Sequence, residues 1–213
     1  MLDNRYIAVE GPIGVGKTSL AEKLSECFNA ELILEKSNDN PFLKSFYKDK
    51  NRYSFQTQTF FLLNRYSQLL ELAQRSLFHN GTVCDYVFQK DRLFASLNLN
   101  KDEFSLYENF YSLLRPKIPA PDLVIFLQAG SDVLINRIRK RARDFEKSIT
   151  FEYLEEVNRA YNNFFFHYVE SPLLVINTTD IDFVEDRKAF DDLVQKIYHH
   201  RVGTQYYVPA GAM

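Results

Sequence analysis

A run of glycines near the N-terminus carries the clearest chemical signal in the sequence. Three glycines fall within six positions and are followed by a lysine and two hydroxyl residues, which fits the pattern G-x-x-x-x-G-K-[ST]. The run reads Gly11, Pro12, Ile13, Gly14, Val15, Gly16, Lys17, Thr18, Ser19. Such a loop curls around a phosphate group and points backbone N–H groups at it from a helix N-terminus. It predicts a nucleoside triphosphate site in which Lys17 reaches the β- and γ-phosphates and Thr18 ligates Mg²⁺.

The elements that must position this loop follow the pattern of an α/β domain. Short apolar runs alternate with long amphipathic stretches, which is typical of a parallel sheet flanked by helices. Five strands are predicted, at Tyr6–Val9, Glu31–Leu34, Val83–Asp85, Leu123–Leu127 and Leu173–Ile176. Helices are predicted over about 17–28, 41–49, 53–79, 88–98, 102–115, 131–142, 150–169 and 184–199. No repeat or linker divides the chain, so we expect one domain over 1–213, with a flexible tail at about 208–213.

Composition excludes several classes of protein. The chain has 213 residues, and its 26 basic and 28 acidic side chains give a net charge of −2, which argues against a nucleic-acid binder. Two cysteines, Cys27 and Cys84, cannot form a disulfide framework and suit a reducing compartment. The N-terminus resembles no signal peptide, and the longest apolar runs are too short to cross a bilayer. We therefore expect a soluble, cytoplasmic protein with no membrane partner.

Among phosphate-loop proteins, two classes lack their defining residues here. A GTPase would need an N-K-x-D segment, and the nearest candidate, Asn177-Thr-Thr-Asp180, lacks the lysine. An ATPase motor would be larger and would carry acidic residues at the end of an extended strand, whereas the fourth predicted strand ends in Gln128. Small-molecule kinases remain, and these bring a second substrate to the carboxyl ends of the strands.

Further motifs resemble the deoxynucleoside kinase family. In chain order they are Gly11–Thr18, Glu35, Asn40-Pro-Phe-Leu43, Tyr47, the helix with Gln58, Asp85, Asp91-Arg92 and the arginine-rich segment 137–146. The resemblance spans residues 5 to 195 approximately, and Cys84-Asp85-Tyr86 is similar to the bacterial deoxyadenosine/deoxyguanosine kinase branch. It implies a P-loop kinase fold with a lid, ATP and Mg²⁺ as cofactors, a small deoxynucleoside substrate and a homodimer.

The resemblance also implies roles on the acceptor side of the site. Glu35 ends the second predicted strand and takes the place of the base that faces the sugar 5′-hydroxyl. Tyr47 takes the place of the tyrosine that binds the 3′-hydroxyl, and Gln58, eleven residues later, that of the glutamine that reads the base. Arg65 follows after seven more residues, so it shares one helix face with Gln58 and with Leu62 between them.

Two aspartates occupy positions of family motifs, although the residues around the first of them differ from the family pattern. Asp85 stands where the family has the glutamate of a Glu-Arg-Ser motif that assists Mg²⁺, and an alternative role is the N-cap of the next helix. The arginine of that motif is missing, and Arg92 or a lid arginine is the candidate to replace it. Asp91 matches the aspartate that pairs with the Arg65 position, a pair that favours purine or amino-bearing bases over thymine. Its alternative is an ordinary salt bridge on a helix surface.

The segment Arg137-Ile-Arg-Lys-Arg-Ala-Arg143 has five basic residues in seven and matches the family's lid, at about 137–148. A solvated helix face is the plainer interpretation. The resemblance implies that Arg137, Arg141 and Arg143 act there on the phosphates and that Glu146 binds the 3′-hydroxyl. It also implies that Phe183 and Arg137 stack on the adenine of ATP, whereas the alternative for Phe183 is a core residue.

Together these features predict an enzyme that phosphorylates deoxynucleosides at the 5′-hydroxyl with ATP, as in nucleotide salvage. Deoxyadenosine and deoxyguanosine are the expected substrates, and deoxycytidine is a further candidate. One alternative is a nucleoside monophosphate kinase such as a thymidylate kinase, which would need an early arginine to bind the substrate phosphate. The other is a regulatory module that binds ATP without turnover, against which the complete set of Lys17, Thr18, Glu35 and Asp85 argues.

Overall fold

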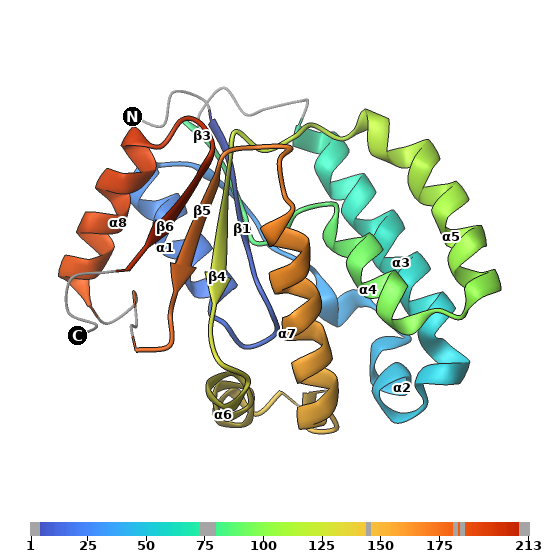
Figure 1. The fold of residues 1–213 in the computed structure, drawn as a ribbon. Coiled ribbons are helices and arrows are strands. Elements are labelled where there is room, and N and C mark those ends of the chain that lie inside the picture. The colour runs from blue at the N-terminus through green and yellow to red at the C-terminus, as the bar shows by residue number, and fades with distance from the viewer. Residues whose placement is uncertain (1–4, 73–79, 144–145, 181–182, 184–185, 209–213) are drawn as a thin grey trace.

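The computed structural model describes residues 5–72, 80–143, 146–180, 183 and 186–208. Within these ranges the sheet has six parallel strands in the order β2-β3-β1-β4-β5-β6 (Figure 1). Their bounds are β1 Arg5–Glu10, β2 Glu31–Ile33, β3 Gly81–Cys84, β4 Leu123–Gln128, β5 Leu173–Asn177 and β6 Thr204–Tyr207. The α/β class with a parallel sheet is confirmed. The central strands β1 and β4 are buried almost throughout, which explains their nearly continuous apolar sequence.

The prediction of five strands missed β6. This strand reads Thr-Gln-Tyr-Tyr and leaves all but Tyr207 exposed, so it lacks the apolar run by which the other strands are recognised. It pairs with β5 at the edge of the sheet, where Leu173 lies opposite Thr204. Its position depends on a neighbouring strand rather than on its own sequence.

Helices lie close to their predicted positions. Their bounds are α1 Lys17–Phe28, α2 Leu43–Lys48, α3 Lys50–Glu71, α4 Lys90–Asn98, α5 Lys101–Leu114, α6 Ser131–Arg141, α7 Phe151–Phe166 and α8 Arg187–His199, with 3₁₀ turns η1 Ser37–Asp39 and η3 Arg115–Lys117. Residues 73–79 of the predicted helix 53–79, and 209–213 of the predicted tail, lie outside the described residues. Local capping sets several starts: Asn100 and Glu103 form a capping box at α5, and Thr150 caps α7.

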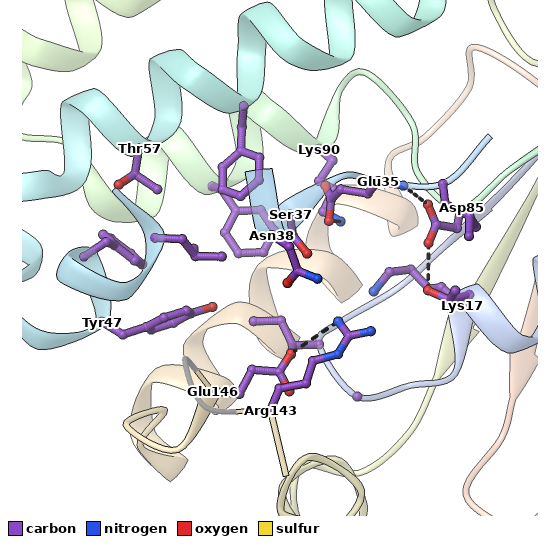
Figure 2. A pocket seen from close by; sticks show the side chains of 18 of the residues that line it. Lys17, Glu35, Ser37, Asn38, Tyr47, Thr57, Asp85, Lys90, Arg143 and Glu146 are labelled. Atoms are coloured by element: carbon purple, nitrogen blue, oxygen red, sulfur yellow. Dashed lines mark hydrogen bonds and ion pairs between the residues drawn. The ribbon is translucent and has the colours of Figure 1, made fainter. Parts of the chain in front are cut away.

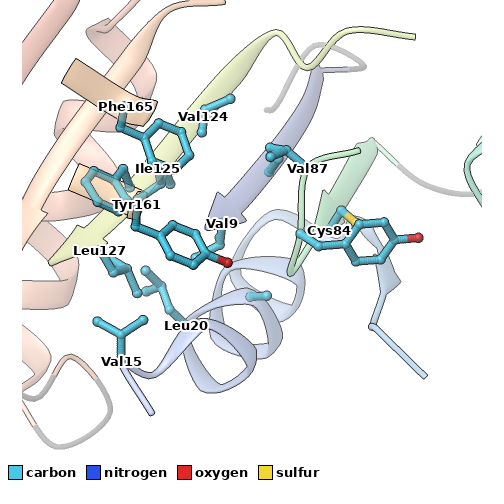
Figure 3. Close-up of a cluster of buried hydrophobic side chains, with 14 of the residues drawn as sticks. Val9, Val15, Leu20, Cys84, Val87, Val124, Ile125, Leu127, Tyr161 and Phe165 are labelled. Carbon is cyan, nitrogen blue, oxygen red and sulfur yellow. The ribbon is translucent and has the colours of Figure 1, made fainter. Parts of the chain in front are cut away.

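The core packs helices against both faces of the sheet. Phe126 of β4 stacks on Phe165 of α7 with ring centroids 4.2 Å apart, and Tyr161 of α7 lies beside them (Figure 3). On the opposite face α1 lies next to α8, where the rings of Phe28 and Tyr198 meet at 5.4 Å. Both α2 and α6 lie at the end toward which the strands run (Figure 1). No helix in the described ranges is long and apolar enough to span a membrane.

Candidate active site

The phosphate loop follows β1 and leads directly into α1. Gly14 and Gly16 have φ of 85° and 105°, in the region that favours glycine. A Cβ on Gly14 would also lie 2.9 Å from the carbonyl oxygen of Leu134, so no larger residue fits. The Nζ of Lys17 donates to the carbonyl oxygens of Gly11 at 2.8 Å and Pro12 at 3.0 Å. The first turn of α1 has no side-chain cap, which leaves N–H groups there for an anion.

A pocket opens beside this loop at the carboxyl ends of the strands, bounded by α2, α3, the start of α4 and the segment after α6 (Figure 2). Most of the predicted site residues line it. They are Ile13, Gly14, Lys17, Thr18, Glu35, Tyr47, Gln58, Arg65, Asp85, Arg141, Arg143 and Glu146. The fold therefore brings together residues that lie up to 133 positions apart in the sequence, from Ile13 to Glu146.

Glu35 lies just beyond β2 and is surrounded by cations. Its Oε1 accepts hydrogen bonds from Nε of Arg65 at 2.9 Å and from Nη2 of the same guanidinium, and its Oε2 accepts from Nζ of Lys90 at 3.3 Å. Burial raises the pKa of the Glu35 carboxyl, but Arg65, Lys90 and Lys17 lower it by more, so the net pKa is well below the usual range. Glu35 is therefore an ionised hydrogen-bond acceptor at neutral pH.

Asp85 connects the phosphate loop to the segment that carries Glu35. Its Oδ2 accepts from Oγ1 of Thr18 at 2.7 Å, and its Oδ1 accepts from the backbone N–H of Glu35 at 2.7 Å. The alternative prediction, a helix N-cap, is wrong because Gln89 is the N-cap residue of α4. A hydroxyl and a carboxylate side by side are the hard oxygen donors that Mg²⁺ prefers, and that ion takes its remaining ligands from phosphates and water. These two residues fit a magnesium ion.

Arg65 bridges two carboxylates inside the protein. Its Nη1 donates to Oδ1 of Asp91, and neither residue is more than 3% exposed, so the interpretation as a surface salt bridge is wrong. Asp91 does not line the pocket; it lies behind Arg65. Within the described part of the chain its Oδ2 has no hydrogen-bond partner. Burial raises the pKa of Asp91 to about 7, although the Arg65 charge acts in the opposite direction.

The predicted lid, 137–148, comprises the end of α6 and the residues after it, of which 144–145 lie outside the described residues. Glu146 is buried and accepts from both Nε and Nη2 of Arg141, while Nη1 of Arg143 lies 4.0 Å from its Oε1. Tyr47 of α2 lies on the same side of the pocket as Glu146 (Figure 2). Burial raises the pKa of Tyr47, as do Tyr153 and Glu146, so its hydroxyl stays protonated.

A second cavity lies on the other side of the phosphate loop. Arg137 and Phe183 line it together with Gly16 and Ser19. The guanidinium of Arg137 donates to the carbonyl oxygens of Thr178 at 2.7 Å and Val15 at 3.4 Å, which connects the loop after β5 to the phosphate loop. Phe183 is buried, as the core interpretation predicts, and it also forms part of the cavity wall.

Comparison with known proteins identifies the family. A family model described as deoxynucleoside kinase matches residues 7–202. The chain belongs to the deoxynucleoside kinase family. This kinase is therefore a phosphotransferase. The predicted family and the predicted activity, phosphorylation of deoxynucleosides, are both confirmed.

Relatives of the kinase match it over nearly its whole length. It is 36% identical to the deoxyguanosine kinase of Bacillus subtilis (strain 168) over 197 residues, which cover 90% of this chain and 95% of that one. It is 30% identical to the deoxyadenosine/deoxycytidine kinase of the same strain over 204 residues, 91% and 92% of the two chains. A structure of deoxyadenosine kinase from M. mycoides with bound dATP matches with a TM-score of 0.78 and 25% identity, covering 92% of this chain and 100% of that one.

Arg92 does not replace the arginine that the family motif has after the strand-end carboxylate. Its side chain is 57% exposed and donates to Glu108 of α5 at 2.9 Å, away from the pocket. The expectation is therefore wrong for Arg92, whereas Arg141 and Arg143 of the predicted lid, the other candidates, line the pocket. The cation that α4 contributes to the pocket is Lys90, two residues before Arg92.

Sequence reasoning missed other residues of the pocket of this kinase. The aromatic wall consists of Phe46, Phe61, Phe94 and Tyr153. Thr57 also lines the pocket, and its buried Oγ1 has no hydrogen-bond partner among the described residues. Glu10 does not line the pocket but lies beside Lys90, fully buried at the end of β1, and it had a signal: it is a charged residue between an apolar strand and the phosphate loop. No local pattern marks Lys90.

Proposed function

We propose that this kinase transfers the γ-phosphoryl group of ATP to the 5′-hydroxyl of deoxyadenosine or deoxyguanosine, with deoxycytidine as a further substrate, in nucleotide salvage. The observation that carries the proposal is an ionised Glu35 in the same pocket as Lys17 of the phosphate loop. Relatives named deoxyguanosine kinase and deoxyadenosine/deoxycytidine kinase support this substrate range.

On the acceptor side, Glu35 orients the 5′-hydroxyl by accepting its hydrogen bond. Its pKa is lowered by Arg65 and Lys90, although burial opposes them, so it is a weak proton acceptor. Such a base suits phosphoryl transfer, whose loose transition state needs the attacking oxygen to be positioned more than deprotonated early. Tyr47 and Glu146, on one side of the pocket, bind the 3′-hydroxyl of the sugar.

Recognition of the base rests on α3. Gln58, Leu62 and Arg65 share its buried face, and Gln58 and Arg65 both line the pocket. An amide donates and accepts at once, so Gln58 pairs with the edge of a base, and Arg65 donates to acceptors such as purine N7. Asp91 acts by holding Arg65 in place. Thymine would leave this arrangement poorly matched, which favours purine and amino-bearing bases.

On the donor side, the phosphate loop from Gly11 to Ser19 holds the phosphates of ATP. Lys17 leaves the carbonyl oxygens that it now contacts and donates to the phosphates instead. Thr18 directly and Asp85 through water would hold Mg²⁺, which neutralises negative charge on the phosphates when it is bound. Arg141 and Arg143 stabilise the transferring group, and Arg137 and Phe183 line the cavity that takes the adenine.

A homodimer belongs to the same proposal. Leu106, Phe110 and Leu113 recur at helical spacing on α5 and are 48%, 42% and 71% exposed. Leu63 and Leu70, on the neighbouring helix α3, are also exposed, at 52% and 37%. An exposed apolar stripe across two adjacent helices is a surface that a second copy of the chain covers. A cytoplasmic location fits both the use of ATP and the two free cysteines.

Phosphate transfer from ATP with Mg²⁺ tests the proposed activity. The acceptors are deoxyadenosine, deoxyguanosine, deoxycytidine and thymidine, with the monophosphates of thymidine and deoxycytidine beside them. We expect turnover of the purine deoxynucleosides and little on thymidine. Strong thymidine turnover would overturn the role of Arg65 and Asp91 in base selection. Activity on monophosphates alone would favour the alternative, a nucleoside monophosphate kinase, and binding of ATP without any turnover would favour a regulatory module.

A further inference from the structure

Lys90 is a buried cation next to the acceptor side of the pocket. It is the first residue of α4, its side chain is 6% exposed, and it lines the pocket beside Glu35 (Figure 2). Its Nζ lies 3.3 Å from Oε2 of Glu35 and 3.9 Å from Oε1 of Glu10. The ammonium therefore lies between two carboxylates, one at the end of β1 and the other just beyond β2.

Glu10 is a fixed anchor for this ammonium. Its Oε1 accepts from the backbone N–H of Gly11 at 2.8 Å and from the hydroxyl of Tyr161 at 3.1 Å, and its Oε2 accepts from the N–H of Val87 at 3.0 Å. The residue is 0% exposed. Since three donors from three segments hold the Glu10 carboxylate, it keeps its position when the Lys90 side chain moves. Its negative charge also helps to keep the buried ammonium of Lys90 protonated. Glu10 and Glu35 raise the pKa of Lys90, against the effect of burial.

No other side chain supplies a cation to Oε2 of Glu35 within the described residues. Arg65 binds Oε1, and Arg92 turns toward α5. Tyr86, which directly follows Asp85, donates from its hydroxyl to Gln68 at 3.1 Å and lies against Arg65 instead of entering the pocket. The two oxygens of Glu35 are thus each held by one cation, from α3 and from α4.

We propose that Lys90 is a positioning residue of the phosphoryl transfer, which holds Oε2 of Glu35 so that the carboxylate faces the acceptor hydroxyl. The inference rests on the proposed function. Stability alone explains the arrangement poorly, because a buried ion pair is often no more stable than apolar residues of similar size. A misplaced carboxylate, in contrast, lowers the rate of a reaction that depends on near-attack geometry.

Steady-state kinetics of K90M, K90R and R92M test this role. We expect K90M to lower kcat about 100-fold, the effect of a misplacement of about 1 Å. The KM values for ATP and the deoxynucleoside should change by no more than about threefold, because the interaction acts in the transition state. K90R should recover most of kcat, since it keeps the charge. R92M, which removes an exposed cation from the same helix, should match the wild type.

A folding control separates positioning from stability. K90M leaves Glu10 buried without a counter-ion, which lowers the melting temperature, whereas the double variant K90M/E10Q removes both charges and should restore it. The kcat of the double variant K90M/E10Q should remain about 100-fold below that of the single variant E10Q, because Lys90 is still absent. The proposal would be overturned if K90M/E10Q recovered both its melting temperature and its kcat. It would also be overturned if K90M had the same kcat as the wild type. Absence of turnover by the wild type would instead overturn the proposed function, and this inference with it.

Discussion

At the scale of single residues, the pocket is organised by opposing charges. Next to the phosphate loop, Glu35, Asp85, Lys17, Arg65 and Lys90 line the pocket, and two buried carboxylates lie behind them, Asp91 beside Arg65 and Glu10 beside Lys90. Glu10 and Glu35 each accept three hydrogen bonds, and Asp85 accepts one at each oxygen. Asp91, in contrast, has one oxygen without a hydrogen-bond partner in the described structure. Burial therefore disfavours the ionised form of Asp91, and the charge of Glu35 adds to this effect, which is consistent with the raised pKa of Asp91.

Asp91 should make the stability of the kinase depend on pH. Its pKa is raised from 3.8 in the unfolded chain to about 7 in the folded protein, so the folded state binds the proton more tightly. The resulting stabilisation is present at low pH and is lost as the pH rises through 7. Urea unfolding of wild type and D91N at pH 5 and pH 8 measures it. The free energy of unfolding of the wild type relative to D91N should be larger at pH 5; a difference independent of pH would show that Arg65 keeps Asp91 ionised.

Asp85 should matter for ATP only when magnesium is present. D85N removes the carboxylate that accepts from Thr18 and that we assign to Mg²⁺. Affinity for ATP measured by calorimetry with Mg²⁺ should fall about tenfold, as for other residues that hold a metal indirectly. Affinity without Mg²⁺ should stay close to that of the wild type. The matched control is D102N, an exposed aspartate in the first turn of α5. Equal losses with and without Mg²⁺ would contradict the metal assignment.

At the scale of elements, local sequence predicts most of the architecture. The alternation of apolar runs and amphipathic stretches places five strands and the helices, since each depends on its own periodicity. The start of α3 at Lys50 was missed by three residues, because the cap is set by Asp49, which accepts from the N–H of Arg52. Strand β6 has no apolar run of its own and forms only because β5 offers an open edge.

Glu146, in the predicted lid, should select for a sugar with a 3′-hydroxyl. In this structure its carboxylate pairs with Arg141, and Tyr47 lies on the same side of the pocket. The wild type should prefer a 2′-deoxynucleoside over its 2′,3′-dideoxy analogue by about tenfold in kcat/KM, the value of one charged hydrogen bond. E146Q should reduce this ratio toward one, while E152Q, an acidic residue in the first turn of α7, should not. An unchanged ratio in E146Q would contradict the assignment.

At the scale of the whole molecule, the site combines residues that sequence can and cannot predict. The phosphate loop is a local pattern, and Glu35 and Asp85 follow from their place at strand ends. The positions of Tyr47, Gln58 and Arg65 came from spacing shared with the family. Lys90 and Glu10 escaped prediction because their contact exists only when α4 packs over the end of β1. The predicted Arg65–Asp91 pair is present. That Arg65 lines the pocket while Asp91 lies behind it depends on how the helices pack, which the sequence does not show.

The exposed stripe on α5 should determine the oligomeric state. F110E and L113E each place a charge in the apolar face that we assign to the dimer. Light scattering should give twice the 25.0 kDa chain mass for the wild type and the single chain mass for these variants. V169E adds the same charge at a residue that is 90% exposed beyond α7, and should remain dimeric. A wild type of single chain mass would contradict the dimer.

Turnover by E35Q tests the central claim most directly, that Glu35 faces the acceptor hydroxyl in the pocket of the phosphate loop. Removal of this carboxylate should lower kcat for the best deoxynucleoside about 1000-fold, within the range for loss of a positioned acid–base group. ATP affinity should be retained, because Glu35 lies on the acceptor side. E31Q, at the start of β2, the strand that leads to Glu35, is the matched control and should turn over normally. Phosphorylation by E35Q near the wild-type rate would contradict the account.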